Sequence, residues 1–266
     1  MEFSGAGAGE VNKPRTQTRL FYDLEQIGKH YRKVLEDKTG DYYERFDPYI
    51  LDKRPMVKAL IQQTFERLFP EKVPVLLDVG CGTCFYFPLL SQRAETLLGI
   101  DVCIPMLDMA QELIETKGLE NCHVRESSAM ELPFEDGTID VVHSWDFLHH
   151  APDVTKALSE ITRVLKPGGR YIAVEPNILN PSILWYHLRR RAEWGLTSKN
   201  QFTLPRRLRR NGFDVKVSYD NTIISFLNEK TQWIWKLANA FTSIWPTKYL
   251  SFRYMMECVK VEKTST

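Results

Sequence analysis

The sequence lacks a surplus of either charge and any long uncharged apolar run. Its 35 Lys and Arg residues nearly balance 34 Asp and Glu residues, so the net charge of +1 gives no global reason to expect a nucleic-acid or strongly acidic partner. No uncharged stretch approaches the roughly 18 residues that a membrane-spanning helix needs. The opening "MEFSGAGAGEVNKPR" lacks the basic-then-apolar order of a signal peptide, so we expect a flexible tail over residues 1–19.

Cysteine is also scarce, and the five residues form no paired framework. They are Cys81, Cys84, Cys103, Cys122 and Cys258. Cys81 and Cys84 have the spacing of a redox or zinc half-site, but no second such pair follows, and we expect no metal site. An odd number of thiols in apolar surroundings favours reduced cysteines and a cytoplasmic protein.

What the sequence does contain is a regular alternation of strand-like and helical segments. The strand-like runs are "VLLDVG", "TLLGID", "CHVRESS", "IDVVHSW" and "RYIAVEPN", followed after residue 212 by "FDVKVSY" and "RYMMECVKVEK". This rhythm predicts βαβ units with helices on both faces of the sheet. We therefore predict an α/β fold: a Rossmann-like, doubly wound sheet of seven strands, mostly parallel, with an antiparallel final strand.

Two helices have clear ends in the sequence. "MLDMAQELIETKG" has apolar residues at helical spacing and stops at Gly118, whereas "DVTKALSEITRVLKPGG" begins at an N-cap, Asp153, and closes on Pro167 and the two glycines after it. We expect one domain over residues 20–266, divided into a helical cap (20–69), a core (70–221), a helical lid insert (222–250) and the last strand with its tail (251–266).

The first strand ends in a turn that a ligand can approach closely. Gly80 and Gly82 let the backbone bend sharply and expose bare peptide after a strand buried on both faces. In open α/β sheets ligands bind beyond the carboxyl ends of the strands, and an acid about twenty residues later binds a ribose diol. Asp101, which closes the second strand, stands at that spacing and indicates an adenosine ligand.

The glycine pattern distinguishes two kinds of adenosine ligand. A pyrophosphate needs a third glycine in G-x-G-x-x-G, and the residues after Gly82 include none. Asp78, directly before the turn, suits a cation better than a diphosphate. A sulfonium with an α-amino group is such a cation, so a nicotinamide or nucleotide-sugar oxidoreductase is the less favoured interpretation.

Together, "DVGCG", Asp101, "SSAMELPFEDGTIDVVHS" and "LKPGGRYIAVEPN" resemble a class I S-adenosylmethionine-dependent methyltransferase of the small-molecule type, over roughly residues 40–215 and the final strand. The resemblance implies that Gly80, Cys81 and Gly82 pass under the methionine part of S-adenosylmethionine and that Asp101 binds its ribose. The sequence departs from the family in two places: many relatives have a third glycine in place of Cys84 and an acid in place of Ser128.

The remaining cofactor residues also follow from the resemblance. Val102 and Met106 would flank one side of the adenine and Ala129 and Met130 the other, with Ser128 accepting a bond from the adenine amine, although more weakly than an acid would. Ser144 and Trp145 would lie near the sulfonium. Arg54 pairs with the cofactor carboxylate in one interpretation and is a solvated arginine in the other.

Methyl transfer from a sulfonium needs alignment more than it needs a catalytic residue. If the acceptor is a hydroxyl, His149 and His150, just beyond the fourth strand, are the candidate bases. The alternative is that one of them makes a structural hydrogen bond. Asp146 either orients an amine substrate or caps the turn, and Glu175 either lines the cleft or binds a loop backbone.

The segment from His187 to Arg210 concentrates positive charge. It holds Arg189, Arg190, Arg191, Lys199, Arg206, Arg207, Arg209 and Arg210 against Glu193 alone. A solvated helical face is the ordinary interpretation, and contact with a phosphate on the substrate or with an anionic lipid is the other. The nearby insert "IISFLNEKTQWIWKLANAFTSIWP" is rich in aromatic residues that either pack as a lid, cover an apolar substrate or lie at a membrane interface.

We therefore expect a methyltransferase that acts on a small apolar or amphiphilic acceptor at oxygen or carbon, such as a lipid-like, isoprenoid or natural-product molecule. The acceptor is either apolar or carries an anionic group, and peripheral membrane contact is conceivable. Nucleic acid is not the expected partner, because "SWDFLHH" stands where base-amine methyltransferases carry an N-P-P-Y-like turn. A nucleic-acid methyltransferase and a catalytically silent cofactor-binding subunit stay open as alternatives, and the sequence does not indicate the oligomeric state.

Overall fold

The computed structural model describes residues 33, 35, 46–189, 191–222, 232–244 and 246–261, without the side chains of residues 191, 192, 232, 234 and 235. The tail expected over residues 1–19 and most of residues 20–45 lie outside this description. The rest of the expected helical cap is represented by α3 and α4, which precede the first strand.

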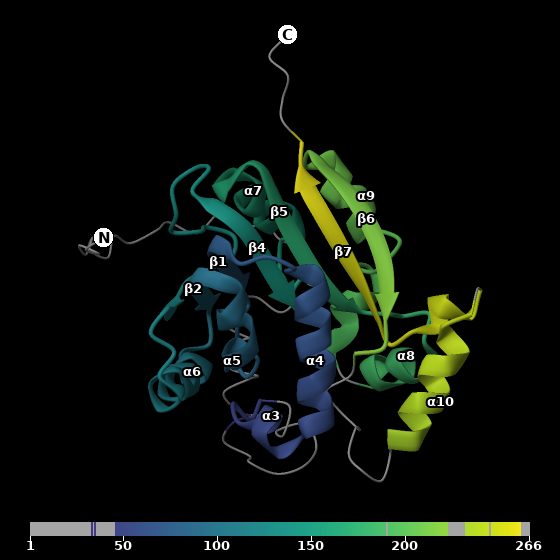
Figure 1. Ribbon diagram of the computed structural model, residues 1–266. Helices are drawn as coiled ribbons and strands as arrows, with labels where there is room; N and C mark the ends of the chain where they lie inside the picture. Colours follow the sequence, from purple (N-terminus) through teal and green to yellow (C-terminus); the bar gives the residue numbers. More distant parts are fainter. Residues whose placement is uncertain are drawn as a thin grey trace.

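Seven strands form one sheet in the order β3-β2-β1-β4-β5-β7-β6 (Figure 1). They are Val73–Val79 (β1), Ala94–Asp101 (β2), Cys122–Glu126 (β3), Ile139–Trp145 (β4), Leu165–Pro176 (β5), Phe213–Asp220 (β6) and Arg253–Lys260 (β7). Strands β1 to β5 pair in parallel, and β7 runs antiparallel to both of its neighbours. The predicted fold class is confirmed, including the antiparallel final strand.

The helices connect these strands and flank them. They are Ile50–Lys53 (α3), Pro55–Leu68 (α4), Phe87–Leu90 (α5), Ile104–Lys117 (α6), Val154–Val164 (α7), Pro181–Leu188 (α8), Leu204–Arg210 (α9) and Gln232–Thr242 (α10), with 3₁₀ turns at Ser91–Arg93 (η1), Arg191–Thr197 (η2) and Thr247–Leu250 (η3). No helix in the described part of the chain combines the length and the apolar composition that crossing a bilayer would take.

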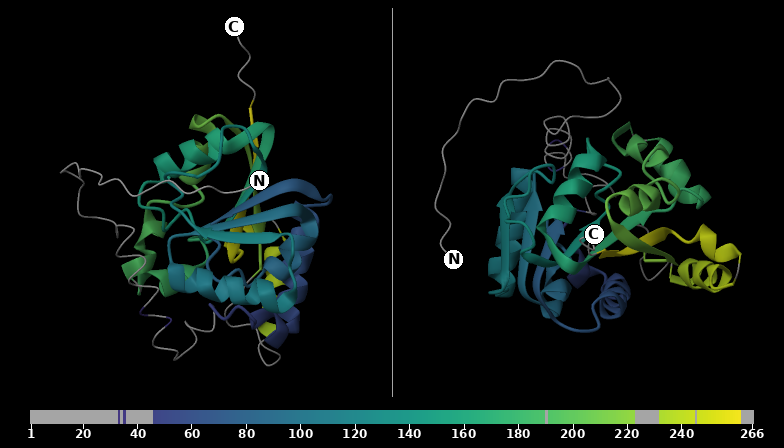
Figure 2. Two further views of the ribbon diagram at one scale, coloured as in Figure 1. Left: turned by 90° about the vertical axis from the view of Figure 1, so that its left-hand side faces the viewer. Right: turned by 90° about the horizontal axis from the view of Figure 1, so that it is seen from above.

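Two hydrophobic cores lie on opposite faces of the sheet. Consecutive residues of β1 belong to different cores, because side chains alternate along a strand: Leu76 packs with α4, α5 and α6, and Leu77 packs with α7 and α9. Both side chains are fully buried. Figure 2 shows the resulting arrangement, with helices on both sides of the twisted sheet. The apolar run of "VLLDVG" in β1 is thus part of a strand buried on both faces, as predicted.

The ends of the two predicted helices differ in how well the sequence located them. Helix α6 ends where expected, because Gly118 adopts a left-handed conformation (φ 61°) at its carboxyl end. The Asp153 side chain caps α7 by accepting hydrogen bonds from the N–H groups of Thr155 and Lys156. The predicted end of α7 at Pro167 is wrong: the helix stops at Val164, and β5 already begins at Leu165 with an irregularity in its pairing to β4. Proline lacks the N–H that a continuing helix needs, so the chain leaves the helix before reaching it.

The expected insert before β7 contains α10 and η3. The side-chain amide of Asn221, just after β6, donates a hydrogen bond to Asn239 Oδ1 of α10 (3.0 Å), which ties the helix to the lower end of the sheet in Figure 1. That end is also where the parallel strands finish. The strand order reverses between β1 and β4, since β2 lies on one side of β1 and β4 on the other, and ligand sites form at such a switch point.

Candidate active site

A cavity opens at the carboxyl ends of β1, β2 and β4, at this switch point. Ten of the residues named from the sequence line it: Gly80, Cys81, Gly82, Asp101, Val102, Met106, Ala129, Met130, Trp145 and His150. They come from four separate segments of the chain. The fold therefore brings together most of the predicted cofactor residues and one of the two predicted catalytic histidines.

The glycine turn after β1 is shaped by positive φ angles and by a close neighbour. Gly80 has φ +75°, and a Cβ atom there would lie 2.8 Å from the Cδ2 atom of Phe147. The N–H groups of Gly80 and Cys81 both donate to the carbonyl oxygen of Ile100 (2.8 and 3.0 Å), which holds the turn against the end of β2. Cys84, where many relatives carry glycine, keeps the left-handed conformation (φ 55°) that glycine would adopt without strain.

Asp101 joins the glycine turn to the start of α6. Its Oδ2 atom accepts a hydrogen bond from the Gly82 N–H (2.9 Å), and its Oδ1 atom accepts one from the Cys103 N–H (2.9 Å). Burial raises the pKa of Asp101 above its ordinary value, although these backbone donors oppose the rise. Each carboxylate oxygen can still accept a further hydrogen bond from a ligand.

Four of the predicted cofactor residues are described by the structure but do not line the cavity: Asp78, Ser128, Ser144 and Arg54. The Asp78 carboxylate is fully buried beneath the turn, where it binds the Tyr86 hydroxyl (2.8 Å) and His143 Nδ1 (2.6 Å). The Ser144 hydroxyl is buried against the hydroxyl of Tyr171 (2.8 Å). The sequence spacing located these two side chains at the strand ends but not the direction in which they point.

Ser128 and Arg54 also differ from what the resemblance implies. The Ser128 hydroxyl accepts a hydrogen bond from the Met130 N–H (3.1 Å), and it is the neighbouring Ser127 that lines the cavity. Arg54 is partly buried at the amino end of α4. Neither residue contributes to the wall of the cavity formed by the described residues.

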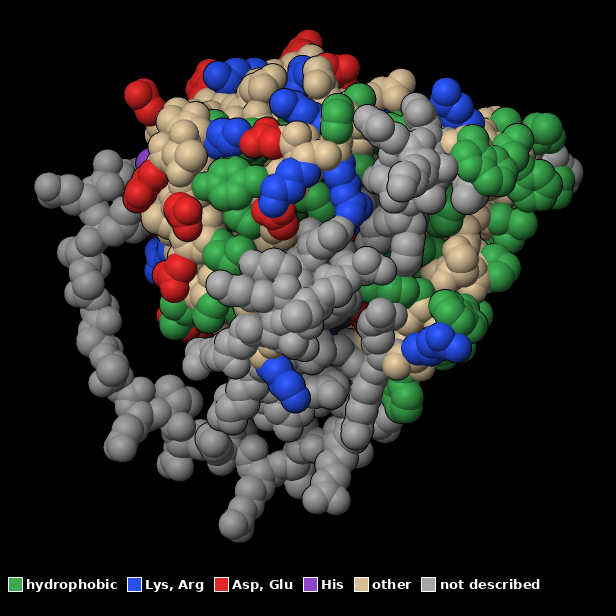
Figure 3. Space-filling model, turned by 90° about the horizontal axis from the view of Figure 1, so that it is seen from below, with side chains coloured by type: hydrophobic (Ala, Val, Ile, Leu, Met, Phe, Trp, Pro, Cys, Tyr) green, Lys and Arg blue, Asp and Glu red, His purple; other side chains and the backbone are tan. Residues whose placement is uncertain are grey.

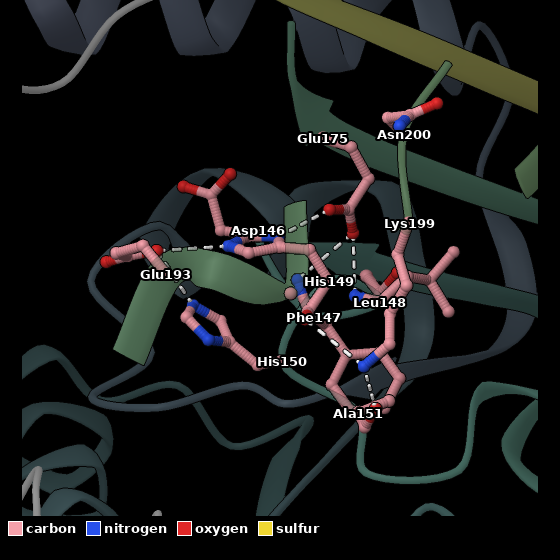
Figure 4. A network of polar contacts seen from close by, with 12 residues as sticks. Asp146, Phe147, Leu148, His149, His150, Ala151, Glu175, Glu193, Lys199 and Asn200 are labelled. Atoms are coloured by element: carbon pink, nitrogen blue, oxygen red, sulfur yellow. Dashed lines mark hydrogen bonds and ion pairs between the residues drawn. The ribbon is translucent and has the colours of Figure 1, made fainter. Parts of the chain in front are cut away.

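The two histidines after β4 occupy different positions (Figure 4). His150 lines the cavity, whereas His149 is buried behind it, and the two ring centroids lie 3.9 Å apart with the ring planes tilted by 41°. His149 Nδ1 lies 2.6 Å from Glu175 Oε2, and its Nε2 lies 3.2 Å from Glu193 Oε2. The structural interpretation of the pair therefore fits His149, and the functional one fits His150.

Glu175, at the end of β5, organises the loop that carries both histidines. Its Oε1 atom accepts hydrogen bonds from the N–H groups of Phe147 (3.2 Å) and Leu148 (2.7 Å), and its Oε2 atom binds His149. Of the two roles considered for Glu175, the structure supports binding of the loop backbone, since the residue is fully buried and does not line the cavity.

Asp146 lines the cavity in a strained conformation. Its φ of 55° is unusual for a residue other than glycine, and both carboxylate oxygens bind the guanidinium of Arg253 on β7. Arg253 also donates to the carbonyl oxygen of Thr222 (2.9 Å) and lies 5.2 Å from the centre of the Trp145 ring. The ion pair ties the loop after β4 to the last strand of the sheet.

The surroundings of His149 and His150 shift the pKa values of the two histidines in opposite directions. Burial alone would lower the pKa of His149, but the carboxylates of Glu175 and Glu193 raise it to about 10. Burial and the charge of His149 lower the pKa of His150 to about 3. Burial alone would raise the pKa of Glu193, but the surrounding imidazoles hold it well below its ordinary value. His150 is therefore neutral and a weak base, able to accept a hydrogen bond from a ligand.

Other residues that line the cavity were not selected from the sequence as part of the site. Glu193 reaches the cavity from η2, and Phe46, Phe85, Tyr86 and Phe147 add aromatic surface. The approach of η2 depends on Gly195, because a Cβ atom there would lie 1.8 Å from the His149 carbonyl oxygen. The glycine at position 195 was the one sequence feature that could have indicated this close approach. The buried Lys199 ammonium also binds the loop, donating to the carbonyl oxygens of His149 (3.4 Å) and Ala151.

The basic segment does not act as a unit. Lys199 is buried beside the site, and Arg189 stacks 3.6 Å from the Trp185 ring centre. On α9, Arg209 donates to the carbonyl oxygen of Val215 on β6 (3.1 Å), whereas Arg207 is close to Lys199: burial, together with the Arg207 charge, lowers the pKa of Lys199 to about 8. None of the described Arg or Lys residues lines the cavity.

Comparison with known proteins agrees with this architecture. Residues 77–173 match the family model of the methyltransferase domain. A demethylmenaquinone methyltransferase of Anoxybacillus flavithermus is 31% identical over 156 residues, covering 56% of this chain and 65% of that protein. One of Bacillus cytotoxicus is 34% identical over 142 residues, covering 52% and 59%. The chain thus spans about three fifths of the length of these curated relatives.

A solved structure shows how far the likeness of fold extends. The S-adenosylmethionine-dependent methyltransferase of Aquifex aeolicus superposes with a TM-score of 0.55 at 18% identity, over 90% of this chain and all of that one. The sheet order, the glycine turn followed by Asp101 and the family match all agree. Residues 77–173 are therefore similar to the methyltransferase domain, within a fold shared with S-adenosylmethionine-dependent methyltransferases.

Proposed function

We propose that this protein transfers a methyl group from S-adenosylmethionine to a small apolar or amphiphilic acceptor, at oxygen or carbon. One observation carries the proposal. The same cavity has a wall of backbone and carboxylate, built by the glycine turn and Asp101, and a further lining of aromatic side chains and His150, which we call its second wall. The first wall suits an adenosyl sulfonium, and the second suits an uncharged acceptor.

The residues present fit the cofactor. Gly80 and Gly82 have positive φ angles and no side chain to obstruct the approach of a ligand. Asp101 retains acceptor capacity for two ribose hydroxyls. Trp145 lines the cavity, and its buried indole N–H has no hydrogen-bond partner in the part of the chain that the structure describes. A buried donor without a partner is costly, which is consistent with a ligand that accepts its hydrogen bond.

S-adenosylmethionine supplies a methyl group on a sulfonium, a leaving group that is already activated. The chain's own residues then have to align the acceptor and exclude water. Phe147 and Trp145 are suited to both tasks, because they form a rigid aromatic surface against the glycine turn. Such a site needs no strong acid or base to catalyse transfer to an acidic hydroxyl or an activated carbon.

His150 is proposed to orient the acceptor. Its ring lines the cavity, and its Nε2 atom lies 3.4 Å from Glu193 Oε2. The His150 ring can form one hydrogen bond, as donor or as acceptor, with an oxygen atom of the methyl acceptor bound in the cavity. The role is tested by His150→Gln, which keeps one hydrogen-bonding group, against His150→Ala. We expect the glutamine variant to retain clearly more activity than the alanine variant, with unchanged S-adenosylhomocysteine affinity in both. Equal loss in the two variants would argue against orientation by hydrogen bonding.

The acceptor's character follows from the lining. Its charged members are Asp101, Asp146 and Glu193, and all three are acidic. Asp146 and Glu193 are already paired with Arg253 and His149, and no described Arg or Lys residue lines the cavity to bind an anionic group, which favours an apolar acceptor. The curated relatives named demethylmenaquinone methyltransferases agree with an apolar, isoprenoid-type acceptor.

A lipid surface is the proposed source of this acceptor. Along α10, Trp233, Leu237 and Phe241 repeat every four residues and are 61%, 62% and 54% exposed, so they form an apolar stripe on one side of the helix. The segment from Gln232 to Leu250 contains no Asp or Glu, and its Lys236 and Lys248 are exposed. Figure 3, looking at the lower end of the molecule, shows hydrophobic side chains gathered on the right, where Figure 1 draws α8 and α10. Exposed aromatic residues beside lysines suit an anionic membrane surface.

The acceptor experiment uses the full chain and tritiated S-adenosylmethionine with three acceptors: a prenylated naphthoquinol, phosphoethanolamine and total tRNA. We expect label in the prenylated naphthoquinol. Label in tRNA alone would support the nucleic-acid alternative, and tight S-adenosylhomocysteine binding without transfer to any acceptor would support a silent subunit. Calorimetry that detected NADH binding but none of S-adenosylhomocysteine would overturn the proposal as a whole.

The membrane contact is tested separately by co-sedimentation with vesicles of phosphatidylglycerol and phosphatidylcholine. The variant Trp233→Ser/Leu237→Ser/Phe241→Ser should lose binding to the anionic vesicles, while Val259→Ser, another exposed apolar position on β7, should not. Wild-type protein that stays in the supernatant with both lipids would contradict the contact without touching the proposed chemistry.

A further inference from the structure

Three imidazole rings converge on one carboxylate beside the cavity. The Nε2 atoms of His149, His150 and His187 lie 3.2, 3.4 and 3.6 Å from the same atom, Glu193 Oε2. His149 and Glu193 are almost completely buried, and His187 is 6% exposed. The residues come from the loop after β4, from α8 and from η2, so the tertiary fold and not a local motif assembles them (Figure 4 shows the part around Glu193).

Two of the rings are held with one particular nitrogen facing the carboxylate. His149 Nδ1 is bound to Glu175 (2.6 Å), and His187 Nδ1 lies 2.7 Å from the carbonyl oxygen of Ile183. A carbonyl oxygen only accepts, so the His187 Nδ1 atom carries the hydrogen and its Nε2 atom presents a lone pair in the neutral ring. This pattern, in which one nitrogen is held by an acceptor and the other points inward, is how proteins orient histidine ligands of metal ions.

A lone pair of His187 then faces an oxygen that also only accepts. Such an arrangement, buried away from water, is stabilised by positive charge close to the two atoms, either from the His149 imidazolium or from a metal ion that takes the place of its proton. The separations indicate which kind of charge. Hydrogen bonds between nitrogen and oxygen span about 2.7–3.2 Å, whereas two ligands of a tetrahedral zinc ion with bonds of about 2.0–2.1 Å lie roughly 3.3–3.4 Å apart. The contacts of Glu193 with His150 and His187, at 3.4 and 3.6 Å, are longer than a hydrogen bond and closer to the second spacing, whereas the contact with His149, at 3.2 Å, fits either.

We propose that His149, His187 and Glu193 bind a divalent transition-metal ion, Zn²⁺ in first place. Their ligand atoms all lie within 4.8 Å of one another, and two imidazoles with one carboxylate are a ligand set that zinc takes when a fourth position is left open. Glu193 also lines the cavity, which gives an ion a route of entry and puts it at the cavity wall. His150 lies beside the site, with its ring centroid 3.9 Å from that of His149.

The test measures metal binding directly and is independent of methyl transfer. Untagged full-length protein is stripped with a chelator and titrated with ZnCl₂ in a calorimeter. We expect one equivalent to bind, with His187→Gln and Glu193→Gln each weakening the affinity by more than about tenfold, the scale on which even the loss of a residue that orients a ligand acts. His123→Gln is the matched control, because His123 is an exposed histidine on β3, and it should bind like the wild type.

A second readout separates loss of the site from loss of the fold. Cobalt substituted into the stripped wild type should give the visible absorption bands of four-coordinate Co²⁺, and these should be absent from the two glutamine variants while their circular dichroism stays native. Equal zinc affinity in the wild type and both variants would overturn the proposal, as would a wild type that binds no zinc or gives only the weak spectrum of six-coordinate Co²⁺.

Discussion

The two walls of the cavity are held together by different forces. On the cofactor side, backbone groups bind one another and Asp101 across the short distance between the ends of β1 and β2. On the acceptor side, buried charged side chains from β5, η2 and β7 hold the loop after β4. A backbone cradle tolerates change in most side chains, whereas a buried ionic network depends on every partner. The first wall is thus suited to a fixed cofactor, and the second is where acceptor specificity can differ between relatives.

The largest expected effect lies on the cofactor side. Asp101→Ala should weaken S-adenosylhomocysteine binding by about 1,000-fold, because two hydrogen bonds to a charged group are lost at roughly 1.5–3 kcal/mol each. Isothermal titration calorimetry measures this. Asp108→Asn, an exposed acid on α6, is the control and should bind normally. An Asp101 variant with near wild-type affinity would mean that the carboxylate serves only the Gly82 and Cys103 backbone.

The acceptor side should instead respond in stability. Glu175→Gln removes the charge from a buried group that accepts from two backbone N–H groups and pairs with His149, so we expect the free energy of unfolding to fall by about 3 kcal/mol. Urea denaturation measures the loss, and Glu112→Gln on the exposed face of α6 should change nothing. S-adenosylhomocysteine affinity should fall far less than in Asp101→Ala. If S-adenosylhomocysteine affinity fell equally in Glu175→Gln and Asp101→Ala, the two walls would not be separate units.

This difference also explains what the sequence could predict. Asp101 and the glycine turn belong to one βαβ unit, where spacing along the chain fixes distance in space, and both were located from that spacing. Glu193 and Gly195 reach the histidines across more than forty residues, through contacts that no periodic pattern records. The directions of Asp78 and Ser144 were also beyond prediction, because an alternating strand specifies a face but not whether a polar side chain turns toward the cavity or toward a buried partner.

The basic segment teaches the same lesson at larger scale. Charge counted along residues 187–210 suggests one patch, but the fold buries Lys199 beside the loop, places Arg189 on the Trp185 ring and packs α9 against β6, and no described Arg or Lys residue lines the cavity. Charge can be counted along the sequence, but the count does not show where the fold places each charged residue. This placement is one reason why we propose an apolar acceptor and not an anionic one.

Gly80 is where the two walls meet, and a paired substitution measures the contact. Gly80→Ala has both a positive φ and a Cβ 2.8 Å from Phe147, whereas Gly137→Ala has a positive φ (64°) with open space around it. We expect Gly80→Ala to destabilise the fold by about 2 kcal/mol more than Gly137→Ala, since only the first adds overpacking to backbone strain. Thermal unfolding gives both values. Equal losses would show that Phe147 moves aside freely and that the walls are not coupled.

The smallest expected effect is on thiol chemistry. Burial, with the neighbouring Cys84 and the acids Asp101 and Asp78, raises the pKa of Cys81 well above its ordinary value. The thiolate is the reactive form, so Cys81 should be alkylated slowly at neutral pH and faster as pH rises toward that pKa. Because Cys81 lines the cavity and Cys258 is buried on β7, S-adenosylhomocysteine should slow the labelling of Cys81 several-fold and leave that of Cys258 unchanged. Mass spectrometry of iodoacetamide-treated protein resolves the two sites. Equal protection of both cysteines would indicate that the ligand reduces the motion of the whole fold. The backbone wall around the cofactor would then not behave independently of the sheet that carries the ionic network.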